Sequence, residues 1–469
     1  MSALTAFPEE TLQKEAVGSP CAGFSSGDRK RFVIVGTGAR VVNFLDPILK
    51  DFAESSTVVG LCDASPTRMR FHLDRIVREY GAAAIPAYAA EDFEKMIREQ
   101  RPDTVIVCTP DTSHHEYIIR ALDMGRDVIS EKPITTDSVK CRAIFDAVKR
   151  SGKTVRTTFN CRWMPGPARV RELVDSGVIG TVRHVQFEEM LNTSHGADYF
   201  RRWHSEKSAS GGLQIHKSTH HFDLINWWVN DIPARVFAFG ELAFYGKANA
   251  VRRGEGDRTG YERYTGAAVA PNDPFQLDLD ADPRLKALYK DAEAESGYIR
   301  DRNVFRDGID IEDSLSVLIK YRSSAIASYT LNAFCPIEGC RVALTGDGGR
   351  IEYTETKYPD VRDKDGRKEI EHGGVRMDIR VIPLFSRGYD VPVLTGQGSH
   401  GGSDMLLQEQ LFAANPPVDP LGRNAGHEQG AASLLIGVAV NHSLDSGQPV
   451  EIDSLLPLNP DAQKFDDLI

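Results

Sequence analysis

The feature that most constrains the fold is a regular alternation of short apolar runs with amphipathic segments between residues 31 and 150. The apolar runs have strand length and are rich in Val and Ile, and helix-like segments lie between and after them. The runs are 57–63, 104–108 and 127–130, and the helix-like segments are 92–101, 114–124 and 139–150. This alternation predicts βαβ units in a parallel, doubly wound sheet, in which ligands bind at the carboxyl ends of the strands.

A glycine-containing turn follows the first apolar run, Arg31-Phe32-Val33-Ile34-Val35. Glycines let a pyrophosphate approach the backbone N–H groups at a helix N-terminus, where a Cβ would be in the way. Val41 replaces the third glycine of the dinucleotide fingerprint, but that position governs helix–strand packing more than phosphate contact. We therefore expect a dinucleotide to bind at Gly36, Thr37, Gly38, Ala39 and Arg40.

Asp63 ends the next apolar run. A carboxylate at this place binds the adenosine ribose hydroxyls in dinucleotide folds and repels a 2′-phosphate, so NAD is favoured over NADP. Arg68 lies close behind and could soften that preference. Alternatively, Asp63 simply caps the helix that follows.

Two further strand ends carry polar clusters. Thr109-Pro110 is followed by Asp111-Thr112-Ser113-His114, and the other cluster is Glu131-Lys132-Pro133. Lys132 could reach a substrate hydroxyl above a nicotinamide ring. It could equally be a solvated lysine in a loop.

The stretch from Gly211 to Asp223 gathers three histidines, a lysine and an aspartate. If it is helical, His216, His220 and Asp223 lie at i, i+4 and i+7 and share one face. Such a face delivers acid–base groups to a ligand, although an ordinary amphipathic helix with surface or core histidines gives the same pattern. His216 and His220 could also chelate a divalent ion with Asp223 or His400. We expect no bound metal.

Together these motifs resemble the Gfo/Idh/MocA family of nicotinamide-dependent sugar and polyol oxidoreductases. The resemblance covers about Arg31 to Ile452 and includes Asn160-Cys161-Arg162-Trp163, Phe334 to Gly339, and Gly346 to Glu352. It implies a Rossmann domain followed by an α+β domain with a mostly antiparallel, open-faced sheet. It also implies a homodimer or homotetramer that contacts its partner through that open face.

By this resemblance, Lys132 and His220 match the family's catalytic pair. A histidine accepts the hydroxyl proton well when its pKa lies near the operating pH, and a neighbouring ammonium steadies the developing oxyanion. His216, which we expect to be catalytic as well, stands where family members usually have an acid, which suggests that it touches a sugar hydroxyl. The expected NAD-binding residues further include Thr109, Pro110, His114, Glu131, Lys132, Asn160 and Arg162, and the expected substrate-binding residues are Trp163, Trp203, His204, Lys217 and His400. Alternatively, Trp203 packs between the domains.

The pattern changes after Ser151. Alternating runs at 181–191, 235–242, 314–321, 325–333 and 341–345 predict a mostly antiparallel sheet. We expect an N-terminal extension or arm (1–30), a Rossmann domain (31–155) and a substrate and oligomerisation domain (156–469). The last contains an insertion at about 245–310 with one helix at 283–296, and a polar loop from which His400 and Asp404 could reach the site or cap a helix.

Charge and composition exclude several other classes. The formal net charge of −11 disfavours nucleic acid and anionic membrane as partners. Seven cysteines without Cys-x-x-Cys favour free thiols in a reducing compartment. Without an apolar leader or a run of membrane-spanning length, the sequence predicts a cytoplasmic protein.

The sequence thus predicts an NAD-dependent oxidoreductase acting on a secondary hydroxyl of a sugar, glycoside or cyclitol, including glycoside 3-oxidation. One alternative is a redox glycosidase that cleaves a glycosidic bond by transient C3 oxidation with tightly held NAD. Another is a nicotinamide-binding regulator without chemistry, against which Lys132 and His220 argue.

Overall fold

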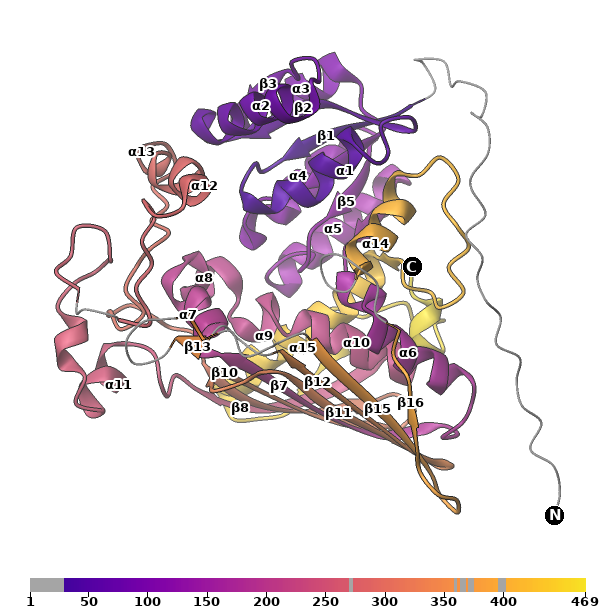
Figure 1. Cartoon of the computed structure of the whole chain (residues 1–469). Helices are drawn as coiled ribbons and strands as arrows, with labels where there is room; N and C mark the ends of the chain where they lie inside the picture. Colours follow the sequence, from indigo (N-terminus) through magenta and orange to yellow (C-terminus); the bar gives the residue numbers. More distant parts are fainter. Residues whose placement is uncertain (1–28, 270–272, 358–360, 363–367, 370–374, 395–401) are drawn as a thin grey trace.

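The structure is a computed structural model. It describes residues 29–269, 273–357, 361–362, 368–369, 375–394 and 402–469 (Figure 1). Most of the expected N-terminal arm, together with His400, lies outside the described residues. Within these ranges, none of the helices combines the length and apolar character that a membrane span requires.

The first unit is a seven-stranded sheet in the order β17-β6-β5-β4-β1-β2-β3, parallel except for β17. The prediction of a doubly wound Rossmann sheet is confirmed. Strands β1 and β4 are buried on both faces because helices cover both sides. The elements are β1 (Lys30–Val35), α1 (Val42–Leu49), β2 (Ser56–Asp63), α2 (Pro66–Tyr80), β3 (Ala87–Ala89), α3 (Phe93–Gln100), β4 (Thr104–Val107), α4 (His114–Asp123), β5 (Asp127–Ser130), α5 (Ser138–Ser151), β6 (Val155–Thr157) and β17 (Ala425–Gly426).

The second unit is a nine-stranded sheet in the order β16-β15-β12-β11-β7-β10-β9-β8-β18. Only β7 and β10 pair in parallel, so the prediction of a mostly antiparallel sheet is confirmed. Four strands, β12, β15, β16 and β18, were not predicted. The strands are β7 (Val182–Asn192), β8 (Pro233–Glu241), β9 (Ser314–Tyr321), β10 (Ile326–Cys335), β11 (Glu338–Gly346), β12 (Gly349–Lys357), β15 (Val375–Pro383), β16 (Tyr389–Val391) and β18 (Val450–Glu451); β13 (Val361–Arg362) and β14 (Lys368–Glu369) form a separate pair.

Helices cover one face of this sheet and leave the other open (Figure 1). Along β9 the side chains alternate, with Leu315, Val317 and Ile319 buried and Leu318 exposed. The covering helices include α6 (Pro165–Asp175), α10 (Thr219–Val229) and α15 (His427–Ser446), and the remaining short helices are α7 (Thr193–Arg201), α8 (Lys207–Ser210), α9 (Leu213–His216), α11 (Lys247–Arg252) and α16 (Ile452–Leu455).

Two predicted helices are broken. The histidine stretch divides into α9 and α10, with Lys217 and Ser218 between them. The predicted helix at 283–296 divides into α12 (Pro283–Leu285), the π-helical turn η7 (Lys286–Lys290) and α13 (Glu293–Ser296). Since Asp282 caps α12 and Gly297 ends α13 in the left-handed conformation, the predicted ends are nevertheless correct.

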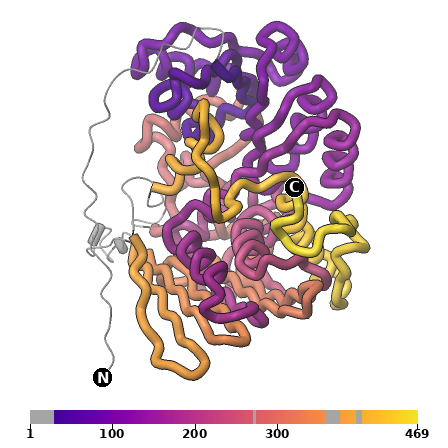
Figure 2. The backbone as a smooth tube through the Cα atoms, turned by 90° about the vertical axis from the view of Figure 1, so that its right-hand side faces the viewer, coloured from indigo at the N-terminus to yellow at the C-terminus, as the bar shows by residue number. Residues whose placement is uncertain are grey.

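A late segment of the chain returns to the first sheet. Helix α14 (Ser403–Phe412) lies against the N-terminal unit (Figure 2), where the rings of Phe412 and Phe32 meet edge to face at 5.3 Å. Strand β17 then extends the first sheet beside β6. The Asp404 carboxylate therefore lies 3.5 Å from the side-chain amide of Asn160.

Candidate functional site

The glycine turn is packed against the end of β4. Gly36 has a φ of +90°, and a Cβ there would lie 2.5 Å from the carbonyl carbon of Cys108. Only glycine fits this close backbone approach in the left-handed region. Without a side chain at Gly36, the turn can bring backbone amides at the start of the following helix toward a pyrophosphate.

The Asp63 carboxylate fastens the end of β2 to this turn. It accepts hydrogen bonds from the Thr37 amide (2.5 Å), the Thr37 hydroxyl (2.9 Å) and the Ser65 amide (2.8 Å). Ser65, not Asp63, caps α2, because its hydroxyl accepts the Arg68 amide. A carboxylate has about four acceptor positions, so Asp63 keeps capacity for a ribose hydroxyl. The turn and this carboxylate fit an NAD dinucleotide.

The two polar strand ends are tied together by His114. Its Nδ1 lies 2.8 Å from the carbonyl oxygen of Pro133, and its Nε2 lies 2.8 Å from that of Thr109. The ring is 1% exposed. Both ring nitrogens thus bind protein carbonyls, and His114 holds the two loops together rather than presenting a free nitrogen to a cofactor. Glu131 forms an ion pair with Arg40 at 2.6 Å, which joins the second loop to the glycine turn.

Lys132 and the histidine segment meet at these strand ends. The Lys132 ammonium donates a hydrogen bond of 2.8 Å to the backbone carbonyl of His216. Burial lowers the pKa of Lys132 to about 8. His220 lies in the same region: burial, and then the charge of Lys132, lowers its pKa well below the usual value. At neutral pH the site therefore holds a neutral imidazole beside a titratable ammonium.

Asp111 completes this group, although the sequence pattern did not predict a role for it. Its carboxylate lies 2.6 Å from Nδ1 of His216. Burial raises the pKa of Asp111 to about 6 and lowers that of His216. An acid–imidazole pair does form, but the acid comes from the first domain. The signal was the Thr-Pro-Asp sequence directly after β4.

Trp203 and His204, two of the expected substrate-binding residues, lie beside His216. The Trp203 ring stacks on His204 with centroids 3.7 Å apart, and the His204 ring lies 4.0 Å from that of His216. Tyr199, which was not predicted, lies 5.7 Å from the same ring. The structure thus brings two predicted substrate residues next to the predicted acid–base group.

Lys217 lies at the edge of this region and interacts with the second sheet. Its ammonium is 3.4 Å from the Glu189 carboxylate, and Nε2 of His221 is 3.5 Å from the other oxygen of that group. Against the effect of burial, Glu189 raises the pKa of Lys217. Lys217 is therefore a permanent cation near neutral pH.

Three expected residues do not join the site. Arg162 is fully buried, and its guanidinium forms a bidentate pair with Asp223 at 2.6 and 2.7 Å. The prediction that Asp223 shares an acid–base face with the histidines is therefore wrong, whereas the cofactor role of Arg162 stays a prediction. Trp163 is 2% exposed and lies beneath Arg423 in the core, apart from Lys132 and the histidines, and its substrate contact stays a prediction.

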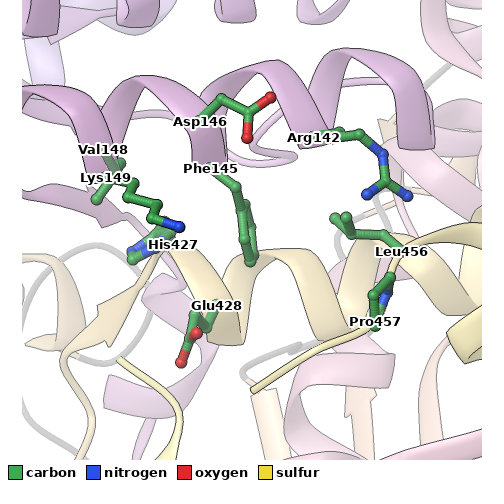
Figure 3. A pocket seen from close by; sticks show the side chains of 9 residues that line it. All are labelled: Arg142, Phe145, Asp146, Val148, Lys149, His427, Glu428, Leu456 and Pro457. Atoms are coloured by element: carbon green, nitrogen blue, oxygen red, sulfur yellow. The ribbon is translucent and has the colours of Figure 1, made fainter. Parts of the chain in front are cut away.

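Neither a cluster of metal ligands nor a further pocket adds residues to this site within the part of the chain that the structure describes. Across the described ranges, no three His, Cys, Asp or Glu side chains are placed to hold a metal ion. A surface pocket of about 350 Å³ lies between α5 and α15 (Figure 3). Phe145 and His427 face each other there, and its lining contains none of the residues described above.

A cluster of arginines was also missed. The Asp198 carboxylate is within 3.3 Å of guanidinium nitrogens of Arg201, Arg202 and Arg300. Three positive charges thus surround one negative charge. Burial is the largest cause that lowers the pKa of His216, and the charges of Lys132 and Arg202 lower it further. Because Arg202 belongs to the cluster, the cluster lies close enough to act on the site electrostatically.

The Rossmann sheet, the glycine turn and the open-faced second sheet define an NAD-binding oxidoreductase with a separate C-terminal α/β domain. The chain belongs to the Gfo/Idh/MocA oxidoreductase family. Residues 30–159 match the model described as "Oxidoreductase family, NAD-binding Rossmann fold", and residues 171–452 match "Oxidoreductase family, C-terminal alpha/beta domain". It is therefore an enzyme of the class that oxidises CH–OH groups with a nicotinamide cofactor.

Known proteins resemble the chain to different extents. YteT of Bacillus subtilis (strain 168), named as an oxidoreductase, is 32% identical over 441 residues, which are 92% of this chain and 99% of YteT. An inositol 2-dehydrogenase/D-chiro-inositol 3-dehydrogenase of Lactiplantibacillus plantarum is 25% identical over 207 residues, 44% of this chain and 54% of that protein. The crystal structure of aldose-aldose oxidoreductase from Caulobacter crescentus superimposes with a TM-score of 0.59 at 17% identity, covering 90% of this chain and 99% of the other.

Proposed function

We propose that this enzyme oxidises a secondary hydroxyl of a sugar, glycoside or cyclitol. The observation that carries the proposal is the convergence of Lys132, His220 and the Asp111–His216 pair at the carboxyl ends of the parallel strands. NAD, when bound, accepts the hydride that leaves the substrate carbon. Neutral His220 takes the hydroxyl proton, and the Lys132 ammonium steadies the oxygen as negative charge develops. The inositol dehydrogenase among the relatives supports this substrate class.

Product analysis tests the proposal. The full-length enzyme is incubated with NAD and a panel of sugars, cyclitols and aryl glycosides, while NADH and free aglycone are followed together. We expect NADH to accumulate with a keto-sugar. Release of aglycone without net NADH would instead establish a redox glycosidase. Binding of NADH without turnover of any panel member would support a regulator.

Within this class, the arginine cluster favours a substrate that carries a carboxylate. Arg300 is buried, and its Nε and Nη1 have no hydrogen-bond partner among the described residues. The Asp198 carboxylate offsets only one of the three neighbouring positive charges. Guanidinium groups bind carboxylates in a bidentate manner. The panel therefore pairs each neutral hexose with its uronate, and equal kcat/KM values for the two would exclude this preference.

The pH dependence follows from Lys132. Its pKa of about 8 means that the ammonium persists below pH 8 and is lost above it. We expect kcat/KM for alcohol oxidation to fall about tenfold per pH unit above pH 8, in proportion to the protonated fraction. Profiles from pH 6 to 10 at saturating NAD measure this. A rate that rises through pH 8 would show that neutral lysine acts as the base.

We also propose that the enzyme is a homo-oligomer in the cytoplasm. The open sheet face carries Phe239 and Leu318, which are 69% and 53% exposed, and apolar side chains of this size favour contact with a partner surface. The six described cysteines are free thiols, which suits a reducing compartment. A monomeric mass in analytical ultracentrifugation at micromolar concentration would contradict the oligomer.

A further inference from the structure

The insertion reaches across to the glycine turn. The backbone amide of Ala39 donates to the Tyr289 hydroxyl at 3.2 Å, and the Arg284 guanidinium donates to the Ala39 carbonyl at 3.1 Å. Figure 1 shows α12 and α13 extending from the second unit toward α2. Ala39 lies at the start of the helix that would face a pyrophosphate. Tyr289 thus contacts a backbone amide at the expected phosphate position.

A carboxylate of the same segment occupies the N-terminus of α2. Glu295 accepts hydrogen bonds from the Ser65 hydroxyl (2.5 Å), the Thr67 hydroxyl (2.6 Å) and the Thr67 amide (3.1 Å). These hydrogen bonds lower the pKa of Glu295, so it is ionised at neutral pH. A helix N-terminus with hydroxyl donors is a natural anion site, and here the anion belongs to the insertion.

The insertion also engages Arg68. Its Nε donates to the Leu288 carbonyl at 2.8 Å, and its Nη2 donates to the Ser296 hydroxyl at 3.0 Å. Nη1 lies 3.9 Å from the Asp63 carboxylate. Arg68, the cation expected to soften the preference for NAD, is therefore held by the insertion and by Asp63.

These contacts coincide with the place where NADP differs from NAD. Asp63 lies where the adenosine ribose binds, and a 2′-phosphate on that ribose needs donors next to Asp63. Ser65, Thr67 and Arg68 are donors in this position, and each of them already donates a hydrogen bond to the insertion. Glu295 further adds a negative charge that repels a phosphate.

We propose that the segment 283–296 is a cofactor-selecting cover, in which Glu295 excludes the 2′-phosphate of NADP and Tyr289 closes the phosphate turn. Selection thus depends on two acids from distant parts of the chain, Asp63 and Glu295. Because Tyr289 contacts the amide that a pyrophosphate would use, the cover must loosen whenever the dinucleotide enters or leaves. Docking of Glu295 on α2 therefore slows cofactor exchange.

The test measures binding of NADH and NADPH to the full-length enzyme without substrate, by nicotinamide fluorescence. Glu295→Gln removes the charge and Glu295→Ala also removes the contacts. We expect each to tighten NADPH binding at least about tenfold relative to NADH. We expect Glu295→Ala to speed NADH release in stopped-flow displacement by a similar factor. The matched control is Asp291→Asn in the same segment, because among the described residues the Asp291 carboxylate pairs with exposed Lys286 and has no hydrogen bond or ion pair to α2.

The outcomes are distinct. A change in the NADPH-to-NADH ratio in both Glu295 variants, but not in Asp291→Asn, supports the cover. An unchanged ratio in both Glu295 variants, with thermal unfolding as in wild type, overturns it and leaves selection to Asp63 alone. An Asp63→Asn variant provides the positive control for a relaxed preference. Because no substrate is present, failure of the proposed sugar oxidation would not affect these measurements.

Discussion

Replacing Lys132 by alanine is expected to lower kcat by about 10²–10³-fold, while the dissociation constant for NADH stays within about threefold of wild type. Its ammonium lies at the strand ends, bound to the His216 carbonyl, where an oxygen anion develops during oxidation. Removing a single electrostatic stabiliser of this kind typically reduces kcat by about 10²–10³. Steady-state kinetics and NADH fluorescence titration measure the two quantities.

The same experiment on His220 separates its role from that of Lys132. His220→Ala removes the proton acceptor, and general base catalysis typically contributes about 10²–10⁴-fold. Because burial holds the wild-type imidazole neutral, we expect His220→Ala to lose turnover at every pH above 6. Lys95→Ala, which removes an exposed lysine beside Asp92, controls for loss of a charge. Wild-type turnover in either site variant would refute the assignment of the pair.

Short-range patterns made the first domain predictable. Apolar runs of strand length and turn glycines act over a few residues, and both β5 and the glycine turn lie where the sequence pattern predicted them. The clash that a Cβ would create at Gly36 is likewise a local consequence of Gly-x-Gly. Edge strands such as β16 and β18 are short and exposed, so they leave little periodicity to detect.

Long-range partners explain what could not be predicted. The helix pattern put Asp223 on a face with the histidines, but its partner Arg162 lies 61 residues earlier. His216 finds its acid, Asp111, at a separation of 105 residues, and Tyr289 meets Ala39 at 250. Such pairs depend on how domains dock, and no local propensity encodes that. A buried arginine in a motif is equally compatible with a cofactor contact and with a core ion pair.

The Arg162–Asp223 pair gives the largest expected effect on stability. Both side chains are fully buried, and Gln429 and the Gly422 carbonyl accept the remaining guanidinium hydrogen bonds. Asp223→Ala leaves that guanidinium charged in an apolar core. Breaking a buried pair in this way costs roughly 3–5 kcal/mol. We therefore expect a lower midpoint of urea unfolding. Tryptophan fluorescence reports this unfolding, because the Trp227 ring lies 5.7 Å from the guanidinium carbon of Arg162.

A double replacement decides whether the pair is structural or part of the cofactor site. Arg162→Met with Asp223→Leu removes both charges and fills the space with apolar atoms, so most of the lost stability should return. Since neither side chain is exposed, NADH affinity of the double variant should match wild type. If the double variant folds with the wild-type midpoint but binds NADH more than about tenfold more weakly, Arg162 contacts the cofactor after all. If both stability and NADH affinity match wild type, Arg162 serves to hold α10 against α15 through Asp223 and Gln429 rather than to bind NAD.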